Sequence, residues 1–377
     1  MRVVQGDNAR DAVRHLAARG AVSLAAVEPA VVGIVGDVRR QGDAALRRYA
    51  EQWDGLMPGQ PLAVSREEIA AAWELVPRDF RAALEHAAAN IRRYCEWQKP
   101  KEWMRSAAPG LRVGQLVRPL QAVGCYVPGG RYPLPSTLLM TVIPAQVAGV
   151  ERIVVVSPRP APQTLAAAAL LGVDSVYRIG GAQAIAALAY GTETIARVDK
   201  IVGPGNLYVT AAKKQVAWDC SIDFLAGPTE VVVVAHQGDP AFIASDLVAQ
   251  AEHDPDASAV FVTCSADLAQ AVVRAAERLS ADNPTAQKSL TENGLILIAD
   301  SSAEAMEFAN RIASEHLTVS PSDLDAVQNA GSVFVGDYSP QAMGDYASGP
   351  NHVLPTAAVA RYRGGLSVLD YLKIISV

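Results

Sequence analysis

The spacing of apolar residues changes about a third of the way along the chain. In the first hundred residues, apolar side chains recur at helical intervals and predict helices over residues 27–53, 66–75 and 79–97, with Gly42 interrupting the first. From about Val117 onward, short runs of β-branched residues alternate with alanine-rich segments. That alternation is typical of parallel βαβ units. The pattern therefore predicts a helical N-terminal region followed by α/β structure.

Two series of α/β elements are predicted, with a division near residue 230. The first has strands over 153–156, 175–179 and 200–202 and helices over 162–171, 182–190 and from about 206. The second has strands over 230–235, 258–263, 295–298 and 333–335 and helices over 241–253, 267–279 and 303–315. The nearly uninterrupted valine run at 230–235 indicates a strand buried on both faces. Asp239 and Pro240 supply an N-cap and a first-turn proline for the helix that follows.

Two apolar segments need a separate interpretation. Residues 132–150 carry no charge and approach the length of a membrane span, but three prolines interrupt them, so we predict a buried helix and no membrane partner. The N-terminus meets charged residues before any apolar run could form a signal peptide. Residues 366–375 resemble the start of a helix, and the chain then stops on an uncapped apolar run. We therefore expect a cytoplasmic protein whose sequence is truncated at the C-terminus.

Composition narrows the range of partners. Half of the 377 residues are apolar and 19% are charged, which rules out intrinsic disorder. Lys and Arg number 33 against 39 Asp and Glu, a net charge of 33 − 39 = −6, so a nucleic-acid partner is not expected. The four cysteines are far apart and form no C-x-x-C pair. They indicate a reducing compartment, with neither a disulfide framework nor a thiolate zinc site.

Common nucleotide motifs are absent from the sequence. It contains neither G-x-G-x-x-G nor G-x-x-x-x-G-K-[ST]. Glycine turns at Gly180-Gly181 and Gly203-Pro204-Gly205 follow predicted strands and precede predicted helices. Such turns let the backbone approach a phosphate, but they are equally compatible with tight turns that bind nothing.

The candidate catalytic chemistry lies in three short segments. Gln250 and His253 are three residues apart, so they share one helical face and can contribute to a metal site, although a capped helix end explains the same spacing. Glu315 and His316 end a predicted helix, where they can serve as an acid–base pair or form an ordinary charged last turn. Asp345 lies in a turn-rich stretch as either a metal ligand or a turn former. The residues alone indicate an α/β enzyme without naming its reaction.

Longer strings in the same regions resemble the histidinol dehydrogenase family. The matching runs occur in the family's order from about residue 110: they begin at Gly124 (GCYVPGG), Gly180 (GGAQAIAALAYGTE), Val202 (VGPGN), Ala226 (AGPTE), Ala249 (AQAEH), Ser314 (SEH) and Gly344 (GDYASGPNHVLP). The resemblance implies an α/β fold of two Rossmann-like domains with parallel sheets. On this chain it gives an N-terminal helical extension over 1–22, a first domain of 23–125 with 231–365, a second domain of 126–230, and the start of a tail over 366–377.

The resemblance also assigns roles to individual residues. Gln250, His253 and Asp345 correspond to zinc ligands, and Glu315 and His316 to the catalytic pair. Contacts with NAD fall on Tyr126, Gln183 and Asn206. Thr229 occupies a substrate-contacting position where the family commonly has Ser, and Gln250, His253, His316 and Asp345 are further substrate contacts.

The implied reaction is the two-step oxidation of L-histidinol through the aldehyde to L-histidine, with zinc and NAD, in a homodimer. His316 takes the hydroxyl proton, and Glu315 helps to activate water for the second step. In the family, a tail beyond the end of this chain supplies a fourth zinc ligand and a substrate-binding Glu, so we expect weakened zinc and substrate affinity here. Three alternatives stay open: a related dehydrogenase of another small alcohol such as a sulfonated diol, a zinc hydrolase using Glu315, and an inactive copy without the tail.

Overall fold

The computed structural model describes residues 1–19, 24–129 and 133–377. The contacts between residues divide the chain into two compact units. Unit 1 comprises Met1–Val22, Ala226–Asp345 and Leu354–Gly365. Unit 2 comprises Ser23–Leu225, Tyr346–Val353 and Leu366–Val377. Each unit is built around its own parallel sheet, which confirms the predicted α/β class.

Unit 1 contains a six-stranded parallel sheet in the order β1-β11-β10-β9-β12-β13. Its strands are β1 (Arg2–Gln5), β9 (Glu230–Val234), β10 (Ser258–Thr263), β11 (Gly294–Ile298), β12 (His316–Val319) and β13 (Ser332–Val335). Its helices are α1 (Gly6–Ala18), α10 (Pro240–Ala251), α11 (Ala266–Leu279), α12 (Pro284–Glu292), α13 (Ser302–Ile312) and α14 (Gln341–Gly344), with 3₁₀ turns η2 (Pro321–Ala326) and η3 (Val359–Arg361).

The central strand β9 is buried on both faces, as its valine run predicted. Val231 and Val233 face an apolar cluster that includes α10 and α11, whereas Val232 and Val234 face a second cluster that includes α1 and α13. Asp239 caps α10 through the amide of Ala241 at 2.8 Å, as expected. Helices on both faces thus enclose the sheet of unit 1.

Unit 2 contains a five-stranded parallel sheet in the order β6-β5-β4-β7-β8. Its strands are β4 (Ala122–Tyr126), β5 (Arg152–Val156), β6 (Val176–Tyr177), β7 (Lys200–Val202) and β8 (Ser221–Ile222). Its helices are α2 (Glu28–Gln41), α3 (Asp43–Tyr49), α4 (Arg66–Leu75), α5 (Arg78–Gln98), α6 (Pro135–Ala148), α7 (Pro162–Leu170), α8 (Gly181–Tyr190) and α9 (Leu207–Val216), with a π-helix η1 (Ala50–Asp54) and a 3₁₀ turn η4 (Val368–Tyr371).

Helix α6 explains the uncharged segment noted in the sequence. Nearly all of its residues are buried within unit 2, including Pro144 in its interior, so the prediction of a buried helix is confirmed. Among the helices of residues 1–19, 24–129 and 133–377, none combines the length and the apolar character that a membrane crossing requires.

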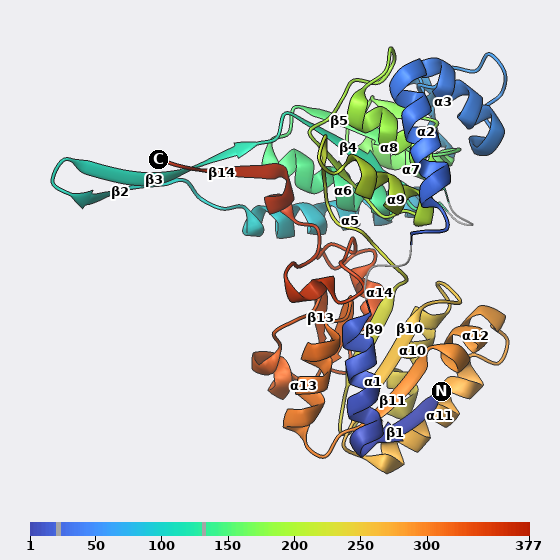
Figure 1. Cartoon of the computed structure of the whole chain (residues 1–377), viewed down its shortest axis with the longest axis vertical. Coiled ribbons are helices and arrows are strands. Elements are labelled where there is room, and N and C mark those ends of the chain that lie inside the picture. Colours follow the sequence, from blue (N-terminus) through green and yellow to red (C-terminus); the bar gives the residue numbers. More distant parts are fainter. Residues whose placement is uncertain (20–23, 130–132) are drawn as a thin grey trace. The chain divides into compact units, whose positions relative to one another are not determined.

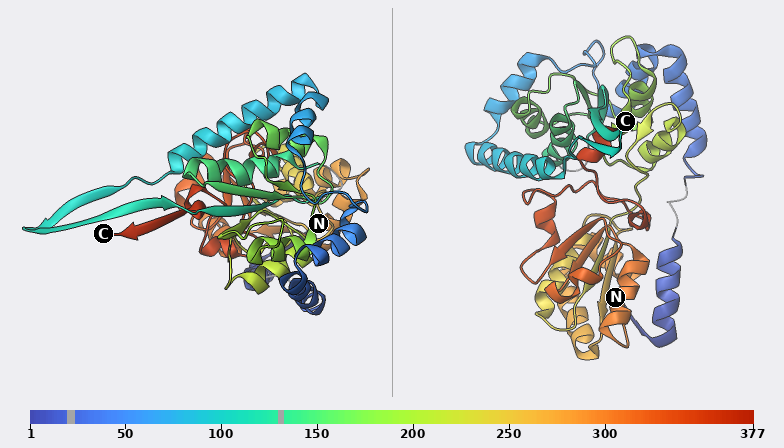
Figure 2. Two further views of the ribbon diagram at one scale, coloured as in Figure 1. Left: turned by 90° about the horizontal axis from the view of Figure 1, so that it is seen from above. Right: turned by 90° about the vertical axis from the view of Figure 1, so that its left-hand side faces the viewer.

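A narrow antiparallel sheet extends from unit 2 as an arm (Figures 1 and 2). It consists of β2 (Trp103–Ala108), β3 (Leu111–Pro119) and β14 (Leu372–Ser376), with β3 in the centre. Every residue of β2 is exposed. Large apolar side chains of the arm that remain exposed are Trp103, Met104, Leu111, Val113, Ile374, Ile375 and Val377.

The division into units differs from the predicted domain boundaries. Residues 23–125 do not group with 231–365, because α2 packs on α8 and α9 and β4 pairs with β5 and β7, all within unit 2. The N-terminal segment is not a separate extension, since β1 pairs in parallel with β11. The predicted helix at 366–375 is also wrong: η4 is followed by β14, whose backbone pairs with β3.

Candidate active site

The candidate residues of unit 1 gather at the amino edge of its sheet. Thr229 immediately precedes β9, and Glu315 immediately precedes β12, which begins at His316. Gln250 lies in the last turn of α10 and His253 just beyond it. Because a crossover helix runs antiparallel to the strands it connects, the end of α10 also faces the amino edge. The fold therefore brings all of these segments to one side of the sheet.

His316 is a buried imidazole with an assigned tautomer. Its side chain is only 7% exposed, and Nδ1 lies 3.2 Å from the carbonyl oxygen of Glu230. Because a carbonyl only accepts hydrogen bonds, Nδ1 carries the proton and Nε2 keeps the lone pair. Burial lowers the pKa of His316, which favours the neutral ring. The predicted position at a helix C-terminus is wrong, since α13 ends at Ile312 and His316 opens a strand.

Glu315 is buried beside this ring, in surroundings that favour the protonated form of its carboxyl group. Its Oε2 accepts hydrogen bonds from the Thr229 hydroxyl and, at 2.9 Å, from the backbone amide of Glu230. The same oxygen lies 3.7 Å from Nδ1 of His316. Burial raises the pKa of Glu315 to about 8, outweighing the two hydrogen bonds that lower it. At neutral pH the carboxyl group is therefore mostly protonated.

The three expected metal ligands lie around the same cluster. Gln250 is almost fully buried and donates from Nε2 to the Thr229 hydroxyl, which leaves Oε1 as the amide atom suited to a metal. Oδ1 of Asp345 lies 4.0 Å from Nε2 of His316. Burial raises the pKa of Asp345, and positive charge on His316 or His253 opposes that rise.

Within the part of the chain that the structure describes, acidic, His and Cys side chains alone form no complete metal centre. Among the residues that the structure describes, no three of these side chains are arranged to hold a metal ion. The cluster does offer an imidazole, a carboxylate and an amide oxygen, and zinc accepts nitrogen and oxygen ligands of these kinds. The donor types thus fit a catalytic zinc site that leaves positions for water or substrate.

An ion pair that the sequence analysis missed stabilises the start of β9. Arg19 binds the buried Glu230 carboxylate through two nitrogens, at 2.7 and 2.5 Å, and the amide of Ala357 donates to the same carboxylate at 3.0 Å. The carbonyl oxygen of Glu230 is the partner of His316. Arg19 and Glu230 are 211 residues apart, so no local pattern could indicate this pair.

The candidate cofactor residues of unit 2 lie at the carboxyl edge of its sheet. Tyr126 ends β4, Gln183 is in the first turn of α8, and Asn206 caps α9 just after β7. Successive strands run to opposite sides of β4, which makes the ends of β4 and β7 a topological switch point. Doubly wound folds bind ligands in the crevice at such a point.

The amides at the starts of both helices already have partners. Gly180 donates to Oδ2 of Asp54 at 2.9 Å, and Gly181 donates to the hydroxyl of Tyr126 at 3.1 Å. Asn206 Oδ1 accepts from the amides of the second and third residues of its helix. Side chains thus occupy positions where many dinucleotide folds place a phosphate, in agreement with the missing glycine fingerprint.

The second glycine turn is held by a buried ion pair. Asp223 accepts from the Gly203 amide at 2.8 Å, and Lys213 donates to the Gly203 carbonyl oxygen at 2.5 Å and to Asp223 at 2.6 Å. Gly203 has a φ of +113°, and a Cβ there would overlap the carbonyl oxygen of Tyr126. Only glycine fits this turn. No motif in the sequence marks either Lys213 or Asp223.

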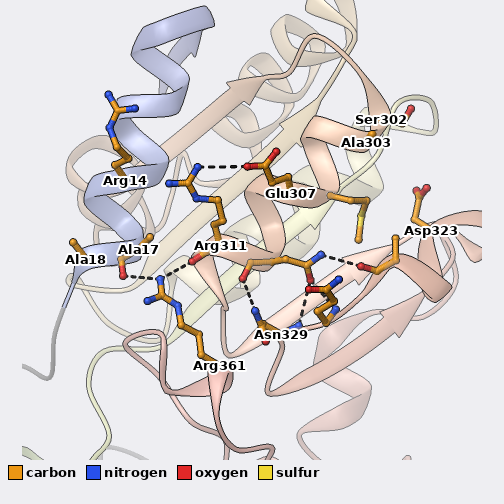
Figure 3. A pocket seen from close by; sticks show the side chains of 14 residues that line it. Arg14, Ala17, Ala18, Ser302, Ala303, Glu307, Arg311, Asp323, Asn329 and Arg361 are labelled. Carbon is orange, nitrogen blue, oxygen red and sulfur yellow. Dashed lines mark hydrogen bonds and ion pairs between the residues drawn. The ribbon is translucent and has the colours of Figure 1, made fainter.

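The groove in Figure 3 is separate from these two clusters. It measures about 1040 Å³ and lies in unit 1 along α1 and α13. Arg361 donates to the carbonyl oxygens of Ala17 and Arg311, at 2.7 and 2.8 Å, and so ties the ends of the two helices together. The expected site residues are not among those that line the groove. Its contacts serve to attach α1 to unit 1.

Comparison with known proteins identifies the family. The histidinol dehydrogenase family model matches residues 17–377. Histidinol dehydrogenase of Methanosarcina mazei is 46% identical over 380 residues, covering 97% of this chain and 87% of the relative. That of Agrobacterium fabrum is 48% identical over 364 residues, covering 93% and 84%. The crystal structure of histidinol dehydrogenase from Elizabethkingia anophelis superposes with a TM-score of 0.94 at 34% identity, covering 100% of this chain and 90% of that one. The chain therefore belongs to the histidinol dehydrogenase family, the oxidoreductases of histidine biosynthesis.

Proposed function

We propose that this chain oxidises L-histidinol to L-histidine in two NAD-dependent steps, through the aldehyde. The observation that carries the proposal is the cluster of buried side chains at the amino edge of unit 1. Nδ1 of His316 is bonded to the Glu230 carbonyl oxygen and lies 3.7 Å from Oε2 of Glu315, while Nε2 lies 4.0 Å from Oδ1 of Asp345. The family membership supports the substrate.

His316 acts as the general base. The bond from Nδ1 to the Glu230 carbonyl holds the ring in one tautomer, so Nε2 is the atom that takes the hydroxyl proton of the alcohol. Burial keeps the ring neutral and therefore able to accept that proton. In the second step, Glu315 accepts a proton from the water that adds to the aldehyde, after losing its own.

The remaining polar side chains of unit 1 hold the substrate and a zinc ion. Gln250, His253 and Asp345 are the proposed zinc ligands and also approach the substrate, as His316 does. Bound zinc would orient the amino-alcohol group and polarise its oxygen. Thr229 links Gln250 to Glu315 by hydrogen bonds and contacts the substrate through the same hydroxyl.

The cofactor binds unit 2 at Tyr126, Gln183 and Asn206. NAD supplies the hydride acceptor in each step. The location of these residues at a topological switch point supports the assignment.

A homodimer in the cytoplasm completes the proposal. The exposed apolar side chains of the arm support a second copy of this chain as the partner, since a thin sheet exposed on both faces buries little apolar surface by itself. Cys95, Cys125, Cys220 and Cys264 are all thiols, which suits a reducing compartment.

The test is NADH formation from L-histidinol by the wild-type chain and by His316→Ala, together with zinc content by mass spectrometry. We expect turnover by the wild type, a loss of ~10²–10⁴-fold in kcat for the variant, and zinc in both. Turnover of a sulfonated diol in place of histidinol would indicate a different alcohol substrate. Ester hydrolysis without NAD would indicate a hydrolase, and equal rates for wild type and variant would contradict the role of His316.

A further inference from the structure

Asp54 connects the N-terminal helical region to the candidate cofactor edge of unit 2. It is the last residue of the π-helix η1 and is only 7% exposed. Its Oδ2 accepts two hydrogen bonds, from the Gly180 amide at 2.9 Å and from Nε2 of Gln183 at 3.1 Å. Short π-helical turns inside helices occur frequently at functional sites.

Asp54 is buried among apolar side chains, where a carboxyl group that only filled space would destabilise the fold. Ala50, Leu56, Ile179 and Ala182 belong to the apolar cluster on this side of the sheet. A carboxyl group in such surroundings costs free energy unless its oxygens are hydrogen-bonded. The start of α8 compensates in part, because a helix N-terminus favours a negative group. The two donors that Asp54 binds both belong to α8 or to the turn before it.

The bond to Asp54 determines which way the Gln183 amide points. Because Oδ2 accepts, the amide nitrogen must face Asp54 and Oε1 must face away. Oε1 lies over Gly181, where an added Cβ would sit 2.7 Å from it. Oε1 is buried and has no hydrogen-bond partner among the described residues. An unpaired buried acceptor costs free energy because it has lost its hydrogen bonds to water, so a donor on a ligand would relieve that cost.

Tyr126 completes the arrangement. Its hydroxyl accepts from the Gly181 amide at 3.1 Å, one residue along from the amide that Asp54 binds. Asp54 therefore holds the Gly180-Gly181 turn and Gln183 in a constant relation to Tyr126. A shift of the turn would therefore displace Gln183 and the hydroxyl of Tyr126, two of the three proposed cofactor contacts, together.

We infer that Asp54 is a positioning residue of the dinucleotide site: it aligns Gln183 and the Gly180-Gly181 turn so that the amide oxygen of Gln183 receives an N–H or O–H donor of the cofactor. The inference rests on the proposed NAD site. It assigns Asp54 no contact with the cofactor itself.

The test measures NADH affinity by fluorescence titration, alongside urea unfolding, for Asp54→Asn and Asp54→Leu. Asparagine can place its oxygen where Oδ2 lies and keep both hydrogen bonds, so we expect a Kd within threefold of wild type. Leucine removes both bonds, so we expect the Kd to rise at least tenfold. In steady-state assays the KM for NAD should rise more than kcat falls. The control is Asp37→Leu, a half-buried carboxylate on α2 that accepts a hydrogen bond from the Tyr49 hydroxyl at 2.7 Å, and it should leave the Kd unchanged.

A second variant keeps the test decisive if Asp54→Leu does not fold. Gln183→Met removes the amide but retains the length of the side chain, and we expect the same rise in Kd. Wild-type affinity in a folded Asp54→Leu would overturn the role of Asp54 while leaving the proposed function intact. Wild-type affinity in Gln183→Met would overturn the same role and would also remove Gln183 from the proposed cofactor contacts. Absence of NADH binding by the wild-type chain would instead overturn the proposed function, and this inference with it.

Discussion

Burial has opposite consequences for the two neighbouring side chains at the centre of the site. It lowers the pKa of His316 and raises that of Glu315 to about 8. Both shifts favour the uncharged form, because a charge loses hydration inside the protein. The imidazole is thus prepared to accept a proton at neutral pH, whereas the carboxyl group must first release one. Two adjacent residues therefore reach their active forms in different pH ranges.

Replacing Glu315 with Gln tests this difference. In the wild type, oxidation of the aldehyde should accelerate as pH rises through about 8, because the ionised fraction of Glu315 grows across that range. Gln keeps the acceptor for Thr229 and the Glu230 amide but cannot titrate. The variant should oxidise the aldehyde more slowly by ~10²-fold or more, and its rate should no longer rise with pH near 8. Both effects are measured by NADH formation from the aldehyde. If the rate of Glu315→Gln still rose with pH around the same midpoint as the wild type, a group other than Glu315 would be responsible for the pH dependence.

A second residue-scale prediction concerns the buried ion pair at Gly203. Lys213→Met should destabilise the chain by about 3–5 kcal/mol in urea unfolding, since it leaves Asp223 buried without its cation. The neighbouring Lys214 provides a matched control: it is exposed and pairs with Glu28, so Lys214→Met should change stability by less than about 1 kcal/mol. Equal effects of the two substitutions would show that the Lys213 pair has no special importance.

At the scale of elements, local patterns predict most of the helices and the strands β5–β7, β9–β11 and β13, but they do not predict others such as β1, β2, β4 and β12. The predicted strands at 258–263 and 200–202 match β10 and β7. The helix predicted over 303–315 stops at Ile312 because Ala313 adopts a left-handed conformation with φ of 53°. Glycine usually marks such an end, and alanine gives no signal there. The strand that carries His316 was therefore missed.

Long-range contacts set the second limit on prediction. The sequence predicts that Gln250 and His253 share a helical face, and the structure places both at the amino edge of unit 1. The sequence contains no sign that Arg19 binds Glu230 or that Asp54 binds Gln183, since these partners are 211 and 129 residues apart. Nor does it show that the C-terminal residues pair with β3, because an edge strand of five residues resembles the start of an apolar helix. Such contacts depend on the folded topology.

Proline substitutions in β14 test the pairing of the arm. Val377 and Gly114 exchange both backbone hydrogen bonds, so Ile375 belongs to the next hydrogen-bonded pair and Ile374 does not. Ile375→Pro should remove a ladder bond and increase amide hydrogen exchange in β3. Ile374→Pro, whose amide points away from β3, should have little effect. A comparable increase for both variants would contradict the register.

At the scale of the whole molecule, the two units place their candidate residues at opposite edges of similar sheets. Unit 2 follows the usual rule of doubly wound folds, with Tyr126 and Asn206 at the carboxyl edge. Unit 1 departs from that rule, with His316 and Glu315 at the amino edge. The assignment of function thus depends on side chains at each edge rather than on the shared topology.

The arm provides the test of assembly. Leu111 and Val113 are exposed on one face of β3, so the double substitution Leu111→Lys with Val113→Lys should convert a dimer into monomers in sedimentation experiments. Trp218→Lys changes an apolar residue that lies outside the arm and is 99% exposed after α9, and it should leave the dimer intact. A monomeric wild type, or a dimer that survives the double substitution, would exclude the arm as the interface.

The most direct test of the proposed function is the end-point stoichiometry with limiting L-histidinol, excess NAD and zinc. We predict two NADH and one L-histidine for each L-histidinol consumed, because the same site oxidises the alcohol and then the hydrated aldehyde. One NADH with accumulation of the aldehyde would contradict the proposed role of Glu315, and no NADH at all would contradict the proposed function.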